Sequence, residues 1–172
     1  GNVLFKTNNG GDLWEVISPD LTKNDIKKHD LGSVPFTNEA AGGEVYNTIM
    51  YAVESQHESG EIWTGSDDGL VFITQDGGEN WRNITPKGMN EGIVNTIELS
   101  PHDKGTAYLS FTRYKFGDLS PSIYKTTNYG KSWTKRVKGI DDNAFVRVVR
   151  EDPNKKDLLY AGTETGLYIS LN

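Results

Sequence analysis

The sequence predicts an all-β fold, an incomplete β-propeller built from blades of four antiparallel strands. Nineteen glycines among 172 residues separate short runs of aromatic and β-branched residues, which indicates many short strands and little helix. A polar octet, Thr-x-Asp/Asn-x-Gly-x-x-Trp, occurs as TNNGGDLW, TQDGGENW and TTNYGKSW, and a fourth begins at SLN. The octets start at residues 7, 74, 126 and 170. Their spacing is close to the roughly 40 to 50 residues of a propeller blade, with extra length in the first interval.

The first octet lies between two short apolar runs, so residues 1–17 are predicted to form strands C and D of a blade. Residues 18–46 are interpreted as a long connection between blades. The chain starts at GNVLFKT, inside a strand-like run and without an initiator methionine. It is therefore interpreted as a fragment of a larger propeller.

Two complete blades, each with strands A to D, are predicted next. In residues 47–85 the four runs are NTIMYAV, EIWTGS, LVFIT and WRNIT, and the octet joins the third run to the fourth. In residues 94–137 they are VNTIELS, TAYLSF, SIYKT and WTKRV. Residues 144–172 supply strands A to C of a further blade as FVRVV, LLYAGT and GLYIS. The whole chain, residues 1–172, is thus one partial propeller.

The octet is predicted to close the hairpin between strands C and D. Its Thr hydroxyl and Asp or Asn oxygen can accept hydrogen bonds from backbone N–H groups inside the turn, and its glycine can adopt a left-handed conformation. The tryptophans of the octets are expected to be buried beside them, and Trp63 is expected to pack between blades. The structural octet residues are Thr7, Asn9, Gly11, Trp14, Thr74, Asp76, Gly78, Trp81, Thr126, Asn128, Gly130, Trp133, Ser170 and Asn172.

The octets resemble Asp-boxes, the repeat of bacterial sialidases, xyloglucanase-type glycoside hydrolases and sortilin-type propellers. Longer phrases such as GSDDGLVFITQDGGENW, SPHDKGTAYLS and YAGTETGLYIS resemble large bacterial propeller proteins of the BNR-repeat, glycosyl-hydrolase-like or sortilin-N-terminal-like type. The resemblance covers essentially the whole chain and implies a propeller. It does not imply one activity, because hydrolases, receptors and proteins without known activity share these repeats.

In such a propeller the A–B and C–D turns lie at one end of the blades, and the B–C turns and the connections between blades lie at the other. The A–B turns are short here, whereas the long segments all belong to the second end, which we call the long-loop face. Functional loops on rigid scaffolds gather in this way, although long loops also simply cover neighbouring blades. The predicted ligand-binding residues on this face are Arg113, Tyr114, Lys115, Phe116 and Asp118.

Candidate catalytic residues are few. Asp67, Asp68 and Glu164 lie in equivalent B–C turns and are nominated as a dispersed acid–base pair, with ordinary turn chemistry as the alternative. A sialidase site would need a cluster of arginines, and the five arginines show no spacing that makes them converge. His29, His57 and His102 lie in separate loops without a second ligand at metal spacing, so they are predicted to be surface residues and no metal site is predicted.

The amino-acid composition argues against several classes of partner. The net charge is −6 with a pI near 5.1, and the basic residues are scattered, so no nucleic-acid partner is predicted. No apolar run approaches the roughly 20 residues needed to span a bilayer, so no membrane insertion is predicted. The absence of cysteine excludes disulfides and thiolate metal sites, and it suits an exported bacterial protein that is periplasmic, cell-surface or extracellular.

The predicted function is recognition or scaffolding, through binding of a protein, peptide or glycan at the long-loop face. Two alternatives stay open: part of a glycoside hydrolase of the xyloglucanase type or a related one that acts on polysaccharide, and a structural subunit of an envelope or secretion assembly. This chain is expected not to be catalytic by itself, and no cofactor is predicted. The expected partners are the remaining blades of a parent chain or other protein chains, because the flanks of an open wedge of blades are apolar.

Overall fold

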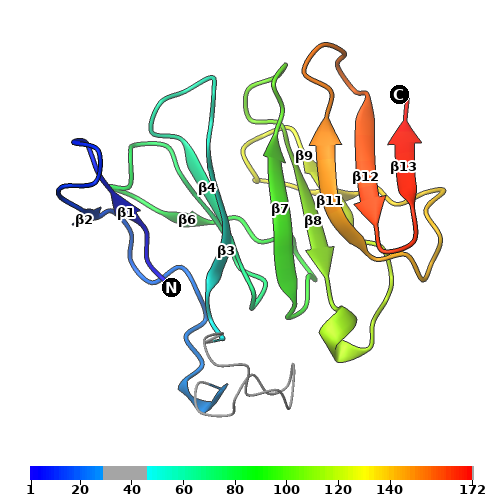
Figure 1. The fold of residues 1–172 in the computed structure, drawn as a ribbon, viewed down its shortest axis with the longest axis horizontal. Coiled ribbons are helices and arrows are strands. Elements are labelled where there is room, and N and C mark those ends of the chain that lie inside the picture. The colour runs from blue at the N-terminus through cyan, green and yellow to red at the C-terminus, as the bar shows by residue number, and fades with distance from the viewer. Residues whose placement is uncertain (29–45, 172) are drawn as a thin grey trace.

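The structure is a computed structural model that describes residues 1–28 and 46–171. Within these residues the chain forms four antiparallel sheets that follow one another from the N-terminus to the C-terminus (Figure 1). Their strand orders are β1–β2, β3–β4–β5–β6, β7–β8–β9–β10 and β11–β12–β13, so strands that are consecutive in the sequence pair with one another. The predicted fold class, all-β with incomplete propeller blades, is confirmed.

The strands follow the runs of apolar and β-branched residues in the sequence. The bounds are β1 (Phe5–Lys6), β2 (Glu15–Val16), β3 (Ile49–Glu54), β4 (Ile62–Ser66), β5 (Val71–Thr74), β6 (Arg82–Asn83), β7 (Ile93–Leu99), β8 (Ala107–Thr112), β9 (Ile123–Thr126), β10 (Thr134–Lys135), β11 (Val146–Glu151), β12 (Leu159–Thr163) and β13 (Leu167–Ser170). Two short 3-10 helices, η1 (Ile26–Lys28) and η2 (Tyr114–Phe116), lie in the connections.

The first strand of each larger sheet contains a β-bulge at the same place. The pairing register shifts so that Met50 in β3, Asn95 in β7 and Arg147 in β11 have no partner across the ladder. A bulge leaves the extra residue unpaired and changes the direction of its side chain. The irregularity therefore repeats once per blade, as the octets do.

The apolar core lies between neighbouring sheets. Gly65 of β4 faces Val94 of β7 so closely that a Cβ atom on residue 65 would lie 2.1 Å from Val94 Cγ1, so only glycine allows this approach. The buried cluster between the second and third sheets includes Trp63, Val71, Ile73, Ile84, Val94, Ile97 and Leu109. The buried cluster between the third and fourth sheets contains Tyr108, Ile123, Val146, Val149 and Ala161.

Each octet is held by the same pair of hydrogen bonds. In the second octet, Thr74 Oγ1 accepts from the Gly78 N–H at 3.0 Å, and Asp76 Oδ1 accepts from the Asn80 N–H at 2.9 Å. Gly78 has a φ of 108°, which a side chain would strain. The first octet repeats the two bonds with Thr7 and Asn9 as acceptors, at 3.0 and 3.0 Å, and the third with Thr126 and Asn128, at 3.1 and 3.0 Å.

Two of the octet tryptophans contact the preceding sheet. The indole N–H of Trp81 donates to the carbonyl oxygen of Ile17 at 2.9 Å, and that of Trp133 donates to the carbonyl oxygen of Ile84 at 2.7 Å. Both rings are partly buried. Trp63 is fully buried and meets Trp133 edge to face, with ring centroids 6.3 Å apart. The expectation that Trp63 packs between blades is therefore confirmed.

The expected burial of Trp14 is wrong, because its ring is 56% exposed. An octet tryptophan is covered by the sheet that precedes its own, and among residues 1–28 and 46–171 no sheet precedes β1–β2. The ring lies over its own octet, 3.8 Å from the position of a Cβ atom on Gly11. Of the fourth octet, Ser170 ends β13, and Asn172 lies outside the described residues.

The A–B turns also join successive sheets. His57 Nε2 lies 3.0 Å from the carbonyl oxygen of Ser100, and His102 Nε2 lies 2.7 Å from that of Asp152, in each case in the next A–B turn. Both histidines are partly buried and contact a neighbouring turn, which the prediction of surface histidines did not include, and His29 lies outside the described residues. Ion pairs between Lys104 and Glu58 and between Lys156 and Asp103 join the same turns.

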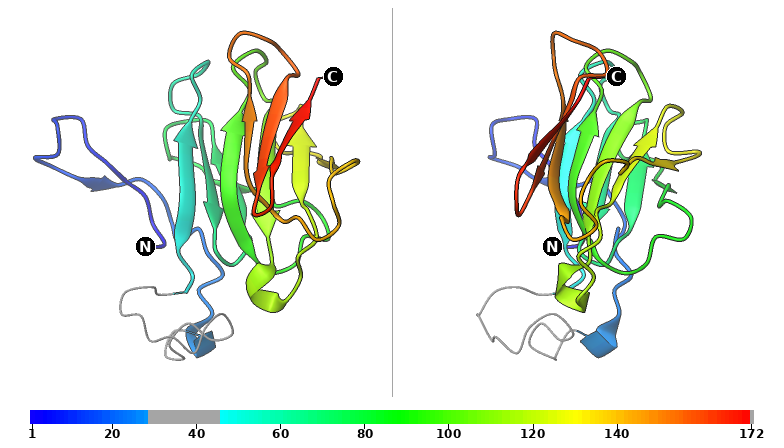
Figure 2. Two further views of the ribbon diagram at one scale, coloured as in Figure 1. Left: turned by 45° about the vertical axis from the view of Figure 1, so that its right-hand side comes forward. Right: turned by 90° about the vertical axis from the view of Figure 1, so that its right-hand side faces the viewer.

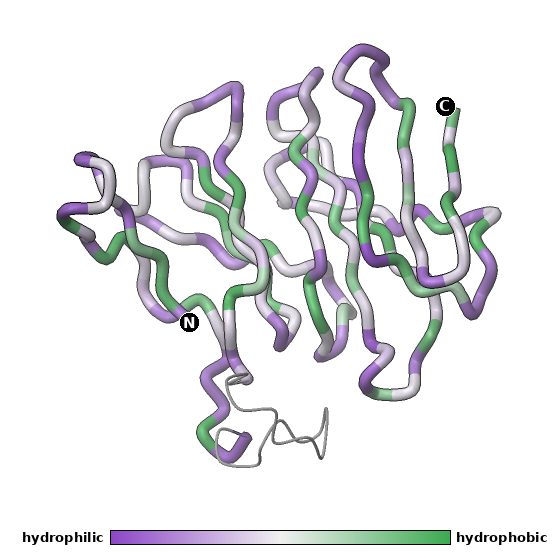
Figure 3. Tube along the Cα trace, in the orientation of Figure 1, coloured by the Kyte–Doolittle hydropathy of each residue, from purple (hydrophilic) through white to green (hydrophobic). Residues whose placement is uncertain are grey.

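The long connections gather at one end of the sheets, where η1 and η2 also lie (Figures 1 and 2). Figure 3 shows hydrophilic residues concentrated in the turns, whereas apolar residues recur along the strands. Among residues 1–28 and 46–171, no helix is both long enough and apolar enough to cross a bilayer.

Candidate functional site

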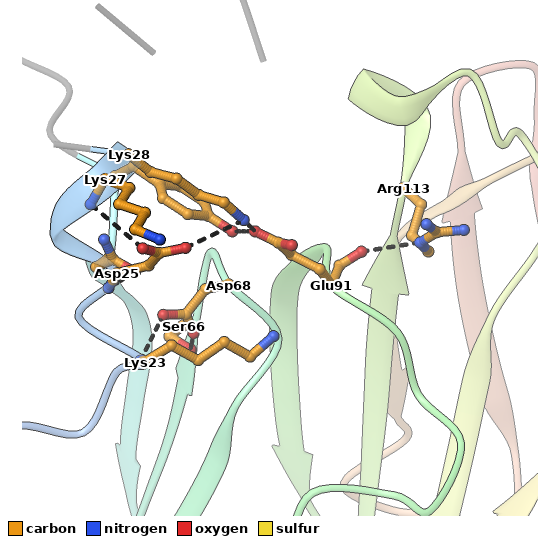
Figure 4. Close-up of polar contacts among 10 residues, drawn as sticks. Lys23, Asp25, Lys27, Lys28, Ser66, Asp68, Glu91 and Arg113 are labelled. Carbon is orange, nitrogen blue, oxygen red and sulfur yellow. Dashed lines mark hydrogen bonds and ion pairs between the residues drawn. The ribbon is translucent and has the colours of Figure 1, made fainter. Parts of the chain in front are cut away.

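Glu91, in the connection between β6 and β7, is the centre of a polar network on the long-loop face (Figure 4). Its carboxylate accepts a hydrogen bond from the hydroxyl of Tyr46 and forms an ion pair with Lys28 Nζ at 2.5 Å. Its backbone carbonyl accepts from Arg113 Nε at 2.8 Å. One residue thus joins the first long connection, the connection between two blades and the B–C loop of the second complete blade.

Besides its bond to Glu91, Arg113 makes contacts within its own loop. Its Nη1 lies 2.9 Å from Asp118 Oδ2, and its guanidinium lies 5.1 Å from the centre of the Phe116 ring. Hydrogen bonds from Ser120 and the ion pair with Arg113 lower the pKa of Asp118 against the opposing effect of burial. All five predicted binding residues therefore lie in one loop around η2, namely Arg113, Tyr114, Lys115, Phe116 and Asp118.

Tyr114 belongs to a second cluster that reaches the fourth sheet. Its ring stacks on Phe145, with centroids 5.2 Å apart and an interplanar angle of 12°. The guanidinium of Arg147 lies over both rings, 4.5 Å from the centre of Tyr114 and 4.9 Å from that of Phe145. Arg147 Nε lies 2.5 Å from Glu164 Oε1, and both side chains of this ion pair are more than 40% exposed. This cluster exposes a cation and a carboxylate to solvent beside two stacked aromatic rings.

Sequence reasoning missed Phe145 and Arg147 as partners of Tyr114. Arg147 is the bulged residue of β11, so counting alternate residues along the strand gives its direction incorrectly. Phe145 immediately precedes β11 and reads as part of a buried strand. Aligning the blades by their octets would have revealed the bulge, because Met50 and Asn95 occupy the position equivalent to Arg147 in their own blades.

The three nominated carboxylates have different partners. Asp68 is fully buried and accepts from the Lys23 N–H at 2.7 Å and from the Ser66 hydroxyl at 2.5 Å, so it fixes the first long connection to the B–C turn. Asp67 Oδ1 accepts from the Thr48 N–H at 2.8 Å. Burial raises the pKa of Asp67 to about 6, although this hydrogen bond opposes the shift. The structure thus pairs Glu164 with Arg147, whose guanidinium lies over Tyr114, and gives Asp67 and Asp68 separate partners.

The described residues offer no metal centre. No group of three or more His, Cys, Asp or Glu side chains within residues 1–28 and 46–171 is placed to hold a metal ion. The described residues of the long-loop face support hydrogen bonding, ion pairing and contact with aromatic rings. With its pKa raised to about 6, the Asp67 carboxyl holds a proton in weakly acidic solution and can act there as a proton donor.

Comparison with known proteins agrees with the fold. No family model matches the chain. It is 25% identical over 170 residues to a probable oligoxyloglucan-reducing end-specific xyloglucanase of Neosartorya fischeri, a match that covers 95% of this chain and 18% of the relative. It is 29% identical over 76 residues to an oligoxyloglucan-reducing end-specific xyloglucanase of Emericella nidulans, covering 42% of this chain and 9% of the relative.

Similar solved structures also agree with the fold. The GH74 xyloglucanase of Xanthomonas campestris superposes with a TM-score of 0.65 at 17% identity and covers 99% of this chain. The fold is that of propeller blades. YCF48 bound to a D1 peptide superposes with a TM-score of 0.55 at 16% identity over 72% of the chain. The chain spans 26% of the first structure and 37% of the second, so it corresponds to part of each.

Proposed function

We propose that the chain is a recognition segment of an Asp-box propeller and that it binds a glycan through the long-loop face. The observation that carries this proposal is the cluster of Arg147, Glu164 and Tyr114, which joins two sheets and exposes paired donors and acceptors beside an aromatic ring. Sugar hydroxyl groups both donate and accept hydrogen bonds, and they match such a mixed surface. The xyloglucanase names of two relatives favour a xyloglucan-type glycan over a protein or peptide.

The proposal includes an arrangement of the chain. We assign residues 1–17 to strands C and D of one blade, 18–46 to an inter-blade connection, 47–85 and 94–137 to full blades, and 144–172 to strands A to C of a further blade. Further blades or other protein chains are then the proposed partners of the two flanks. Export is proposed from the absence of cysteine, with bacterial origin resting on the resemblance alone.

The test is a titration of the protein with xyloglucan oligosaccharides by isothermal calorimetry. We expect Arg147→Ala to weaken binding at least about tenfold, a loss of roughly 1.4 kcal/mol. Lys156→Ala is the matched control, because it removes an exposed ion pair at the opposite end of the sheets. Absence of binding to xyloglucan, or equal losses from the two substitutions, would contradict the proposal. Binding of peptides instead would favour the scaffold alternative.

A second candidate function is participation in a glycoside hydrolase, and the raised pKa of Asp67 favours it. A general acid must hold its proton at the working pH, and a carboxyl group with a pKa of about 6 does so in weakly acidic solution. Hydrolysis also needs a second carboxylate about 5 to 9.5 Å away, in the retaining or the inverting geometry. In this case that partner would come from a blade outside the described residues.

The two candidates predict different assays. If Asp67 is the acid, cleavage of xyloglucan oligosaccharides falls as the pH rises through about 6 and is lost in Asp67→Asn. Asp25→Asn is the control, since Asp25 lies in the same region, where its carboxylate accepts from the Lys27 N–H and pairs with Lys28 Nζ at 3.8 Å. Binding without turnover, unaffected by Asp67→Asn, would support recognition alone.

A further inference from the structure

A cavity of about 550 Å³ lies at the end of the sheets opposite the long-loop face, a volume in the range of small-molecule sites. It is built where the first strands of the three larger sheets end, and these strands, β3, β7 and β11, lie next to one another (Figure 1). The A–B turns that follow these strands, together with Tyr160 of β12, complete the lining. None of the described lining residues belongs to the first hairpin, to an octet or to β13, so three adjacent sheets form this cavity by themselves.

The cavity combines an apolar wall with an excess of carboxylates. The apolar lining residues are Val53, Leu99, Pro101 and Pro153. The charged lining residues are Glu54, Glu98, Arg150, Glu151 and Asp152. Arg150 already has partners, because its Nη1 lies 3.3 Å from Glu98 Oε2 and its Nη2 donates to the Tyr51 hydroxyl at 3.4 Å. The described lining therefore carries more negative than positive charge.

Glu98 of β7 reaches from the third sheet to the fourth. Its Oε1 accepts from the Glu151 N–H at 3.2 Å, and 19% of its side chain is exposed. Burial raises the pKa of Glu98 and the charge of Glu151 adds to this effect, although the bond from the Glu151 N–H and the charge of Arg150 oppose it. A raised carboxyl pKa means that the surroundings do not fully compensate the carboxylate charge.

Glu151 of β11 has one carboxylate oxygen without a donor. The residue is only 4% exposed, and its Oε1 accepts from the Asp157 N–H at 2.9 Å and from the Tyr108 hydroxyl at 3.5 Å. Within residues 1–28 and 46–171, Glu151 Oε2 has no hydrogen-bond partner. Lys156 interacts electrostatically with Glu151, but its Nζ lies 2.6 Å from Asp103 Oδ2. Because buried polar atoms almost always have a partner, this oxygen is an acceptor that a ligand in the cavity can use.

We propose that the cavity binds an alkylammonium group, carried either by a lysine side chain of a peptide or by a free primary amine. The ammonium group lies between the carboxylates of Glu98 and Glu151 and donates a charge-assisted hydrogen bond to Glu151 Oε2. Its apolar stem packs on Val53 and Leu99. An ammonium group is a compact cation with three donors, whereas no group of three or more His, Cys, Asp or Glu in the described residues is placed to hold a metal ion. The site is independent of the proposed glycan recognition, because the Arg147 cluster lies at the other end of the sheets.

The test is an NMR titration of the isotope-labelled protein, followed through the backbone amide signals of Leu99 and Arg150. The probes are N-acetyl-lysine methylamide and n-pentylamine, and N-acetyl-norleucine methylamide is the control that keeps the apolar stem but has no charge. Glu98→Gln removes the carboxylate charge and keeps an acceptor for the Glu151 N–H. Glu79→Gln is the matched control variant, because it removes the same charge from an exposed residue of the second octet, outside the cavity. The dispersion of the amide signals shows whether each variant is folded.

We expect the ammonium probes to shift both signals with dissociation constants of about 1 mM, and Glu98→Gln to weaken this binding about tenfold while Glu79→Gln leaves it unchanged. Binding of the blocked lysine assigns the site to a peptide side chain, and binding of n-pentylamine alone assigns it to a free amine.

Three results would overturn the proposal. They are equal binding of the norleucine and lysine probes, an unchanged affinity in Glu98→Gln, and the absence of any shift at Leu99 and Arg150. The comparison of the lysine and norleucine probes is made on the wild-type protein, so it does not depend on the folding of a variant.

Discussion

The first octet hairpin and the two later ones differ although their sequences and internal bonds agree. All three octets carry the same threonine and Asp or Asn hydrogen bonds, at distances between 2.9 and 3.1 Å. Trp81 and Trp133 nevertheless contact the preceding sheet, whereas Trp14 is mostly exposed. The turn is therefore encoded locally, and the burial of the tryptophan is a property of the neighbouring sheet.

The largest expected loss of stability comes from removing the Trp133 ring between the second and third sheets. Trp133→Ala should lower the free energy of unfolding by about 3 to 5 kcal/mol, because it empties the space beside Trp63 and leaves the Ile84 carbonyl without its donor. In dilute protein, Trp14→Ala should change it by less than about 0.5 kcal/mol, as exposed substitutions do. Denaturant titrations measure both, and equal losses would remove the distinction between the hairpins.

Substitutions of the octet glycines test the same difference between the first hairpin and the later ones, with a smaller expected loss in the free energy of unfolding. Gly78 and Gly11 have φ values of 108° and 103°, so alanine strains both, at about 1 kcal/mol each. A Cβ atom on Gly78 would also lie 2.4 Å from the Ile17 carbonyl oxygen, whereas one on Gly11 would meet only the Trp14 ring at 3.8 Å. Gly78→Ala should therefore cost about 2 to 3 kcal/mol in total and Gly11→Ala about 1 kcal/mol. A larger loss from Gly11→Ala would contradict the role given to the preceding sheet.

The smallest effect concerns charge, because only the second octet has Asp where the others have Asn. Hydrogen bonds from the Asn80 N–H and side chain, with one from Thr74, lower the pKa of Asp76 to about 2. A carboxyl whose folded pKa lies below its unfolded value of 3.8 stabilises the fold above that value and loses this contribution as the pH falls through about 2. Melting temperatures from pH 5 to pH 2 should fall less for Asp76→Asn than for the wild type. Parallel curves would show that the charge is irrelevant.

The sequence predicted what depends on local chemistry. Alternating apolar runs gave the strands from β3 to β13 to within a few residues, and the glycine and Thr–Asp pattern gave the octet turns, because these depend on neighbours in the chain. The order of the sheets followed from the repeat spacing. The exposure of Trp14 was not predictable in this way, because it depends on which sheets lie beside the hairpin.

The candidate site was predicted only in part for the same reason. The loop from Arg113 to Asp118 was found by its length and mixed composition, and the structure places it on the long-loop face. Its contact with Phe145, Arg147 and Glu164 joins two blades and involves a bulge, and neither is visible in a residue count along one strand. The roles of Asp67 and Asp68 likewise depend on partners from the first long connection and on burial.

The recurring bulge gives this architecture one position in each blade that is open to variation. Methionine, asparagine and arginine occupy it at Met50, Asn95 and Arg147, yet the ladder on either side keeps the same register in all three sheets. Asn95 donates to the Thr112 hydroxyl at 2.8 Å, Arg147 pairs with Glu164, and Met50 is half exposed. Duplicated blades can therefore differ in the chemistry of this residue while keeping the same strand pairing. A library of variants at these three positions would sample new binding specificities at little risk to the fold.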